Sequence, residues 1–445
     1  MIAGAVERYG KKELLAVAVI FLLINPCIAN KVYLLVYVFA LLIGYASVPN
    51  GFILYIVFYT KLFGLYSNEL QGGTNIILFK DAAFFIAFGI LLRWFTDMLN
   101  SKFRVSKKYF FWIIVFMCTL FSGVFVANIR WGQPIFKSVI TFRVYLPLLI
   151  IFPLADWMKN QRVNFHYFME VFSNITIIVC LILLIQYYIF PNKMLVQVAK
   201  VTSDRVFSNG YRFLIHSSSQ WMTLIAAYNY YVIRSRTCSG KYVNPRIAFW
   251  LILIVLLGVA QTKMYIASLF MTIILIELFF IRNNANLLFR MIKICCAILL
   301  PVCVFASMFS PGFSKWYIDL FKHTGNPIRI RAFDFFWDSI KDAYPFFGGG
   351  ITNTSYPNSP QTIGLTMNCT LSDLGIWGFY YQFGMQGCLA LFKCYLLNIS
   401  TSKKKNESLY YFISISSILI ILQMLTVAPD LSIFIYTTAA VLALE

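Results

Sequence analysis

Residues 109–127 read YFFWIIVFMCTLFSGVFVA, a predominantly apolar stretch without a charged side chain. A helix needs about 20 such residues to cross the roughly 30 Å hydrocarbon core of a bilayer. Four basic residues precede the stretch: Lys102, Arg104, Lys107 and Lys108. Because Lys and Arg collect in cytoplasmic loops close to helix ends, the segment predicts a transmembrane helix that begins at the cytoplasmic side.

The composition of the whole chain is equally apolar. Of its 445 residues, 60% are hydrophobic and 12% are charged, and the mean hydropathy is +0.75. Soluble domains average about 45–50% apolar and about 25% charged residues. A soluble fold of this length could not cover its apolar side chains, so the composition excludes a soluble globular protein.

Apolar runs recur along the chain. Asn25-Pro26 and Pro49-Asn50-Gly51 separate the first three of them. We expect an all-α polytopic membrane protein with about 14 transmembrane helices, in a range of about 12–14. The runs lie near residues 14–29, 31–47, 51–66, 75–95, 109–127, 139–157, 170–190, 211–233, 247–262, 264–281, 293–310, 371–397, 409–426 and 430–444.

Basic residues give an independent check on this assignment. With about 14 spans, every basic cluster lies on the same side as the N-terminus, so we expect both termini in the cytoplasm. The clusters also account for most of the net charge of +20, which favours topology over nucleic-acid binding. They comprise Arg8, Lys11 and Lys12; Lys102, Arg104, Lys107 and Lys108; Lys159 and Arg162; Arg234, Arg236, Lys241 and Arg246; Arg282, Arg290 and Lys293; and Lys403, Lys404 and Lys405.

Motifs for cofactors and disulfides are missing from the sequence. Most of the ten cysteines lie in apolar runs and none forms a CxxC pair, which is typical of small apolar packing residues. The histidines at 166, 216 and 323 lack the spacing of metal ligands. Neither GxxxxGK[ST] nor GxGxxG occurs. We therefore expect no metal, no cofactor and no nucleotide hydrolysis.

The expected orientation places three loops on the outer side, near residues 128–138, 191–210 and 311–370. Basic residues occur in and beside these loops, although the preference of Lys and Arg for cytoplasmic loops predicts few of them there. An anionic ligand is the simplest reason for their presence. Long side chains that reach back to the interface are the alternative reason for any single one. These residues are Arg130, Lys137, Arg143, Lys193, Lys200, Arg205, Arg212, Lys263, Lys315, Lys322, Arg329 and Arg331.

Three of these cations lie at the ends of predicted spans. Arg143 is about one turn inside the sixth span, Arg212 is at the mouth of the eighth, and Lys263 lies between the ninth and tenth. A charge at such a depth costs about 2.5–3.5 kcal/mol unless it faces a cavity or a partner, so these positions are candidate functional residues.

The long outer loop carries its own helical pattern. Phe333, Phe336, Trp337 and Ile340 recur at helical spacing, which predicts an amphipathic helix at the membrane interface over about residues 328–343. Its polar side would combine cations for phosphate with carboxylates able to accept a proton, or would simply be an ion-paired face. The polar side presents Arg331, Asp334, Asp338, Lys341 and Asp342.

Three motifs and their order resemble the O-antigen polymerases (Wzy type) within the O-antigen ligase and polymerase superfamily. One is RIRAFDFFWDSIKDAYPFFGGG at residues 329–350, similar to the family's Arg, aromatic-rich helix, Pro and Gly-rich turn. The second is LSDLGIWGFYYQFGMQG at residues 371–387. The third is AQTKMYIAS, in which Lys263 takes a place often held by Arg. The expected parts are helices 1–11 in residues 1–310, a large periplasmic loop in 311–370, and helices 12–14 in 371–445.

The resemblance implies a glycosyltransferase that acts at the periplasmic face of the bacterial inner membrane. Such enzymes join a glycan on undecaprenyl pyrophosphate to the sugar of another lipid-linked repeat unit, without metal or nucleotide sugar. The implied partners are this substrate, membrane lipids and a chain-length regulator protein. Guanidinium groups would stabilise the departing pyrophosphate. The candidate pyrophosphate-binding residues are Arg143, Arg205, Arg212, Lys263, Arg329 and Arg331.

The residue that removes the acceptor proton stays open in the sequence. The related ligases carry a His-Asn pair before the helix that follows the large loop, whereas this chain has Met367-Asn368, which argues against a ligase. A flippase for the same glycan is the other competing interpretation, although no internal repeat is visible. Asp373 could simply cap the next helix, and His323 could be an ordinary loop residue. The candidate catalytic residues are Arg331, Asp334, Asp338, His323 and Asp373.

Overall fold

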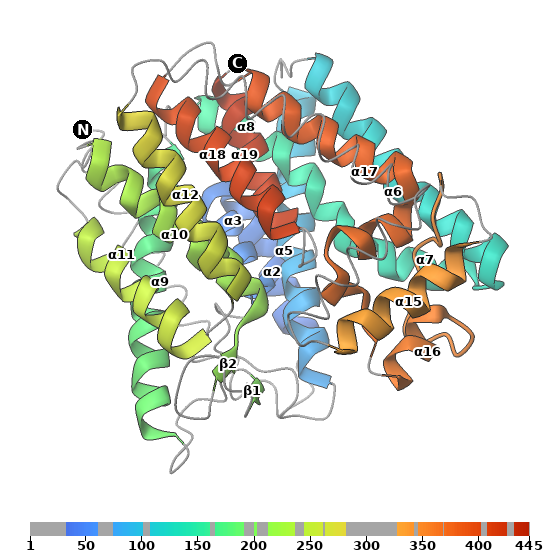
Figure 1. Cartoon of the computed structure of the whole chain (residues 1–445). Helices are drawn as coiled ribbons and strands as arrows, with labels where there is room; N and C mark the ends of the chain where they lie inside the picture. Colours follow the sequence, from blue (N-terminus) through green and yellow to red (C-terminus); the bar gives the residue numbers. More distant parts are fainter. Residues whose placement is uncertain are drawn as a thin grey trace. The chain divides into compact units, whose positions relative to one another are not determined.

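In the residues that it describes, the computed structural model of the chain is helical apart from one short strand pair (Figure 1). The structure describes thirteen segments of the chain. They are residues 33–60, 74–100, 107–160, 165–190, 200–202, 212–235, 244–260, 263–281, 327–341, 346–367, 369–401, 407–424 and 431–444.

These residues fall into two compact units, each assembled from separate parts of the sequence. The first comprises the described residues within 1–104, 149–273 and 432–444, and the second comprises those within 105–148 and 274–431. The division of the chain at residues 310 and 370 that the sequence suggested stays a prediction.

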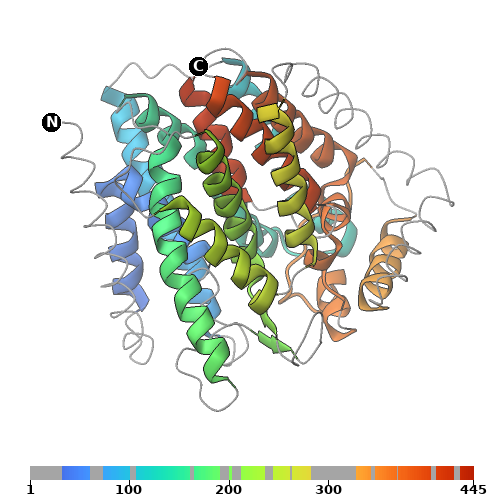
Figure 2. The same ribbon diagram turned by 60° about the vertical axis from the view of Figure 1, so that its left-hand side comes forward.

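The first unit is built mainly of helices. Figure 2 shows three of them, α9, α10 and α11, packed side by side. The elements are α2 (Tyr33–Ala46), α3 (Val48–Tyr59), α5 (Thr74–Asn100), α8 (Ile151–Asn160), α9 (Phe165–Ile189), β1 (Lys200–Thr202), β2 (Arg212–Leu214), α10 (His216–Ser235), α11 (Pro245–Ile254), the π-helical turn η2 (Val255–Ala260), most of α12 (Lys263–Ile281) and α19 (Leu431–Leu444).

Close backbone approach joins α2 to α5. A Cβ atom added to Gly44 would lie 2.2 Å from the carbonyl oxygen of Ile86, and one added to Gly89 would lie 2.2 Å from that of Leu41. Glycines therefore let these apolar helices pack backbone to backbone, as small residues do in membrane helix pairs.

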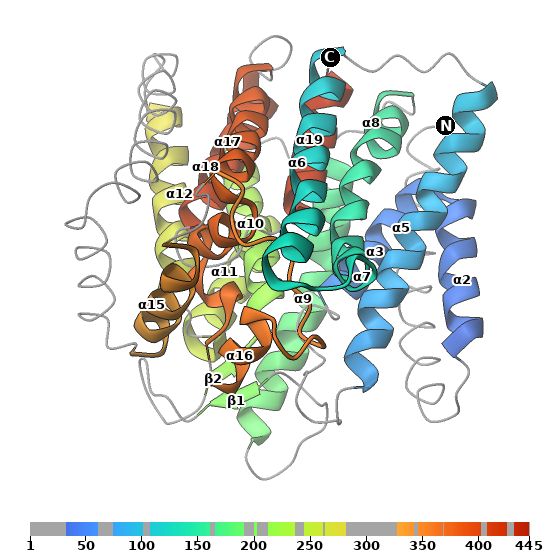
Figure 3. The ribbon, with the colours of Figure 1, turned by 90° about the vertical axis from the view of Figure 1, so that its right-hand side faces the viewer.

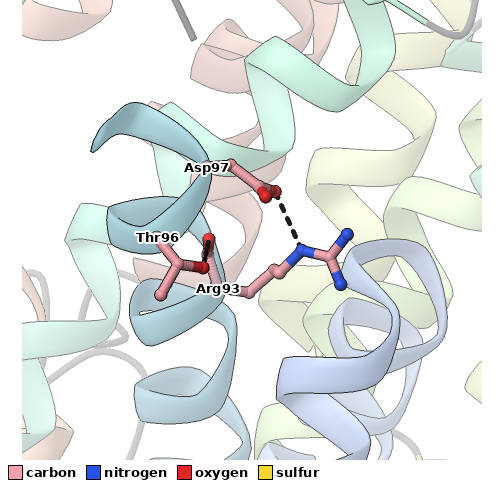
Figure 4. Close-up of polar contacts among 3 residues, drawn as sticks. All are labelled: Arg93, Thr96 and Asp97. Atoms are coloured by element: carbon pink, nitrogen blue, oxygen red, sulfur yellow. Dashed lines mark hydrogen bonds and ion pairs between the residues drawn. The ribbon is translucent and has the colours of Figure 1, made fainter. Parts of the chain in front are cut away.

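A surface ion pair marks the last turns of α5 (Figure 4). The Arg93 Nε atom lies 2.9 Å from the Asp97 carboxylate, one turn further along, and the Thr96 hydroxyl donates to the Arg93 carbonyl oxygen. The Arg93 guanidinium also lies 5.9 Å from the centre of the Tyr45 ring on α2. An exposed ion pair of this kind, one turn apart on a helix, contributes about 0.3–0.5 kcal/mol to stability.

Aromatic side chains fill the centre of the first unit. Phe52, Phe168, Phe172, Trp221 and Tyr436 are all buried and contact one another through their rings. They come from α3, α9, α10 and α19, so the last helix of the chain belongs to this core.

The second unit contains the predicted amphipathic helix. Its elements are α6 (Lys107–Trp131), α7 (Ile135–Phe142), the 3₁₀ segment η1 (Arg143–Ile150) up to Leu148, α15 (Pro327–Lys341), α16 (Pro360–Thr366), the 3₁₀ turn η3 (Leu371–Leu374), α17 (Ile376–Thr401) and α18 (Glu407–Met424).

Four apolar helical segments are long enough to cross a membrane within the described part of the chain: Asp81–Leu99, Lys108–Trp131, Ile135–Lys159 and His166–Ile189. They agree with four of the predicted runs and support a membrane protein. Shorter apolar helices coincide with several other predicted runs, among them Val48–Tyr59 and Leu431–Ala443. The predicted spans at 14–29 and 293–310 lie outside the described residues.

Three predicted spans differ in detail from the helices observed. The run at 211–233 begins as strand β2, which pairs antiparallel with β1, and α10 starts only at His216. The run at 139–157 is a succession of α7, η1 and α8 with Pro147 inside η1, because proline lacks the backbone N–H that a regular helix uses. The run at 371–397 starts as η3 and breaks again at Gly384.

Candidate functional site

Helix α15 carries the largest group of predicted site residues. Its chain enters at Pro327, a residue suited to the first turn of a helix. Ala332, Phe333 and Phe336 are buried, whereas Arg331, Asp334 and Asp338 are exposed. The prediction of an amphipathic helix is therefore confirmed. The helix spans Pro327–Lys341, so it begins one residue before and ends two residues before the predicted bounds of about 328–343.

Helices α15 and α17 pack against each other (Figure 3). The apolar face of α15 and the facing side of α17 both contribute aromatic rings to this contact. Phe333 meets Trp377 edge to face at 5.9 Å between ring centres, and Phe336 meets Tyr381 at 5.0 Å. Trp337 stacks on Tyr380. Each pair contributes about 0.5–1.5 kcal/mol beyond area burial. Protein side chains thus cover the face that the sequence had assigned to the membrane interface.

Arg331, on the polar face of α15, lies near the segment that joins α16 to η3. Helix α15 contacts both α16 and η3. The Cys369 thiol in this segment is 2% exposed, so burial raises its pKa, while the nearby Arg331 charge lowers it. The Arg331 guanidinium is therefore close enough to act electrostatically on Cys369, two residues before η3.

Asp373 lies within η3, the turn that contacts α15. Gly375, with φ of 59°, ends η3 and precedes α17, so Asp373 does not occupy the capping position of α17 that the sequence had offered as its alternative role. Helix α15, which carries the predicted residues Arg329, Arg331, Asp334 and Asp338, thus contacts the turn that contains Asp373.

The Gly-rich turn after α15 and the residue that follows it are hydrogen-bonded to α17 and α6. The N–H groups of Gly349 and Gly350 donate to the carbonyl oxygens of Tyr381 and Gln382 on α17. The Ile351 N–H donates to the Gly123 carbonyl oxygen on α6. Because these amides are already used, the turn does not offer them to an anion.

Glycine is required at the turn because of its backbone conformation. Gly348 and Gly350 have φ of 74° and 82°, and Gly384 in α17 has φ of 63°. A Cβ atom added to Gly384 would lie 2.2 Å from the Phe346 carbonyl oxygen. The turn therefore fills the break in α17 and supplies hydrogen bonds for carbonyl groups that the break leaves without helical partners.

The corner between α6 and α7 holds the same segment from the other side. Arg130 donates from Nη1 to the Gly348 carbonyl oxygen at 3.0 Å, and the Trp131 indole donates to the Gly349 carbonyl oxygen at 2.7 Å. Arg130 belongs to the outer cations that the sequence assigned to an anionic ligand. Its bond to Gly348 gives it a structural role, and the expectation of an anionic ligand stays a prediction.

Lys137 in α7 likewise contacts the polar segment. Its ammonium group donates to the Ser355 carbonyl oxygen and lies 5.9 Å from the centre of the Tyr356 ring. The Tyr356 hydroxyl bonds in turn to the Gly132 carbonyl oxygen. The polar stretch after the glycines is thus folded against α7 and continues into α16.

The remaining predicted cations are more dispersed. Arg143 lies half-buried at the junction of α7 and η1. Arg212 is in β2 and Lys263 is the first residue of α12, both in the first unit. Arg205 and His323 lie outside the described residues.

Metal-binding geometry is not found among the described side chains, where no group of three or more His, Cys, Asp or Glu residues could hold an ion. Five described cysteines are free thiols: Cys118, Cys180, Cys369, Cys388 and Cys394.

Comparisons with protein-family models, curated proteins and solved structures give no match.

Proposed function

We propose that the chain is a polysaccharide polymerase of the inner membrane. It transfers a glycan from undecaprenyl pyrophosphate to a sugar hydroxyl of another lipid-linked repeat unit, at the periplasmic face. The observation that carries this proposal is the exposed polar face of α15, on which Arg331, Asp334 and Asp338 lie together while the opposite face is buried. The O-antigen polymerase resemblance supplies the substrate class.

The reaction needs two groups that this face provides. The bond between the anomeric carbon and the pyrophosphate oxygen breaks, and a bond to the acceptor oxygen forms. Arg331, together with Arg329, stabilises the negative charge that collects on the pyrophosphate. Asp334 or Asp338 accepts the proton of the acceptor hydroxyl. The aromatic packing of α15 keeps these groups in fixed positions, which lowers the cost of ordering them during the reaction.

The proposal includes a full topology of about 14 transmembrane helices with both termini in the cytoplasm. In that arrangement α15 lies at the periplasmic face. A chain-length regulator is the proposed protein partner. Arg143, Arg205, Arg212 and Lys263 are proposed to bind pyrophosphate, and His323 and Asp373 remain further candidates for the base.

Extension of a lipid-linked repeat unit by the purified protein in liposomes tests the proposal. Arg331→Ala should lower kcat by about 100-fold, the usual scale for loss of one group that stabilises transition-state charge. Arg246→Ala removes an equally exposed Arg at the start of α11 and should leave the rate unchanged. Asp334→Asn and Asp338→Asn, measured in the same assay, decide which carboxylate is the base.

The competing activities give different products in this assay. Release of glycan onto a lipid A acceptor without chain growth would indicate a ligase. Movement of the lipid-linked unit across the liposome membrane without a new glycosidic bond would indicate a flippase. Equal chain growth by wild type and Arg331→Ala would remove Arg331 from the mechanism.

A further inference from the structure

Gln133 is a fully buried amide at the corner between α6 and α7. It follows Gly132, whose φ of 64° turns the chain out of α6, and it precedes Pro134 at the start of α7. Its side chain is 0% exposed. A buried amide costs free energy unless its donors and its acceptor find partners.

Both ends of the Gln133 amide are used. Nε2 donates to the Ser138 hydroxyl and, at 3.1 Å, to the Ile351 carbonyl oxygen. Oε1 accepts from the Asn353 backbone N–H at 2.8 Å. Two of the three partners are therefore backbone groups of the segment that follows the Gly-rich turn, some 220 positions later in the chain.

Asn353 extends this contact in two directions. Its side-chain amide donates to the Lys137 carbonyl oxygen and the Thr141 hydroxyl on α7. Its carbonyl oxygen accepts from the hydroxyl of Ser359, the residue that caps α16. Helix α16 then contacts α15. A continuous series of contacts thus runs from Gln133 to the helix that carries Arg331.

We propose that Gln133 is a positioning residue, which fixes residues 351–359 and through them the placement of α16 and α15. The inference rests on the polymerase function proposed above, because it assigns Gln133 to the geometry of that reaction. Gln133 does not touch the reacting atoms. It acts through backbone groups, so its loss displaces the segment without removing any catalytic side chain.

The chemistry of the amide makes the proposal specific. Gln133→Leu has a similar size and removes all three bonds. Gln133→Glu keeps the acceptor for Asn353 but brings a carboxylate oxygen against the Ile351 carbonyl oxygen, where a donor is needed. Both variants should release the segment. Gln423→Leu is the matched control, since Gln423 on α18 is also buried and the substitution is the same.

The first measurement is of position. Spin labels attached through a keto amino acid at Phe136 and Thr354, both exposed, avoid the ten native cysteines. The distance distribution between the labels should be narrow in the parent protein and in Gln423→Leu, and should broaden in Gln133→Leu and Gln133→Glu. An unchanged distribution in the two Gln133 variants would overturn the proposal.

The second measurement is of rate. In the liposome assay, Gln133→Leu should lower kcat at least about tenfold with little change in KM, because misplacement of bound groups slows the chemical step more than binding. Gln423→Leu should show no comparable loss. An equal loss of kcat in Gln133→Leu and Gln423→Leu would mean that loss of any buried amide slows the reaction to the same extent, which contradicts a positioning role specific to Gln133.

The two proposals fail in different ways. If the wild-type protein does not extend lipid-linked units, the proposed polymerase function and the proposed role of Gln133 in that reaction are both contradicted. The label distances would still decide whether Gln133 holds residues 351–359 in place. An active wild type with an equally active Gln133→Leu would remove the positioning role alone.

Discussion

At the scale of single residues, Trp131 shows how a ring at a helix end serves as a hydrogen-bond donor. Its indole N–H donates to the Gly349 carbonyl oxygen, and the Arg130 guanidinium lies 5.2 Å from its ring centre. The tryptophan therefore joins the end of α6 to the Gly-rich turn, and its ring also makes a cation–π contact with the Arg130 side chain. Removal of the N–H alone would leave a backbone carbonyl without this partner.

Trp131→Phe should destabilise the protein by about 1–3 kcal/mol, because it leaves the Gly349 carbonyl oxygen without its donor. Thermal unfolding in detergent measures the change. Trp250→Phe is the control: Trp250 is 59% exposed on α11, and its replacement should shift Tm much less. Equal shifts in the two variants would mean that the Trp131 bond adds no stability.

Residue patterns in the sequence predicted some of this site and missed the rest for a physical reason. Arg331, Asp334 and Asp338 were predicted on one polar face because helical periodicity is a local signal. Gln133 and Asn353 gave no such signal, since their partners are about 220 positions away. The bond from Arg130 to the Gly348 carbonyl oxygen could not be predicted either, because the charge of Arg130 is visible in the sequence and its carbonyl partner, 218 positions away, is not.

At the scale of elements, the break in α17 and the Gly-rich turn form one structure. Gly348 and Gly384 approach so closely that a Cβ atom added to Gly348 would lie 2.5 Å from the Gly384 nitrogen. A helix interrupted within an apolar protein must find other partners for its free backbone groups. Here the turn provides them, so neither element is stable in this form without the other.

Gly384→Ala should destabilise the second unit severely. The new methyl group would clash with the Phe346 carbonyl oxygen, and the positive φ alone costs about 1–3 kcal/mol for a residue other than glycine. Gly258→Ala in η2 is the matched control, because no atom lies within 4 Å of its added Cβ. Yield and thermal stability in detergent distinguish them, and an equally stable Gly384→Ala would contradict the close approach.

Element boundaries were harder to predict than element types. The apolar run at 211–233 gave no sign that it begins with β2, because a strand of three residues has too short a pattern to detect. Helix α16 was expected to be part of a polar loop. Its short length hides helical periodicity, although Ser359 and Pro360 at its start are typical of a helix N-terminus.

At the scale of the whole molecule, the proposed number of spans and their proposed direction rest on the alternation of basic loops in the sequence. The proposal expects the C-terminus in the cytoplasm and α15 in the periplasm. A green fluorescent protein fused after Leu444 should fluoresce, and alkaline phosphatase fused after Lys341 should be active. An active phosphatase at the C-terminus, or a fluorescent fusion after Lys341, would reverse the orientation.

The place of α19 in the first core has a consequence for biosynthesis. The buried Trp221 indole donates at 2.8 Å to the Ser432 hydroxyl, near the very end of the chain. During translation α10 is made well before that hydroxyl, because Ser432 lies 211 positions after Trp221, so the indole has no Ser432 partner until α19 has been synthesised. The first unit therefore cannot reach its final packing while residues 216–235 are made and residues 431–444 are not.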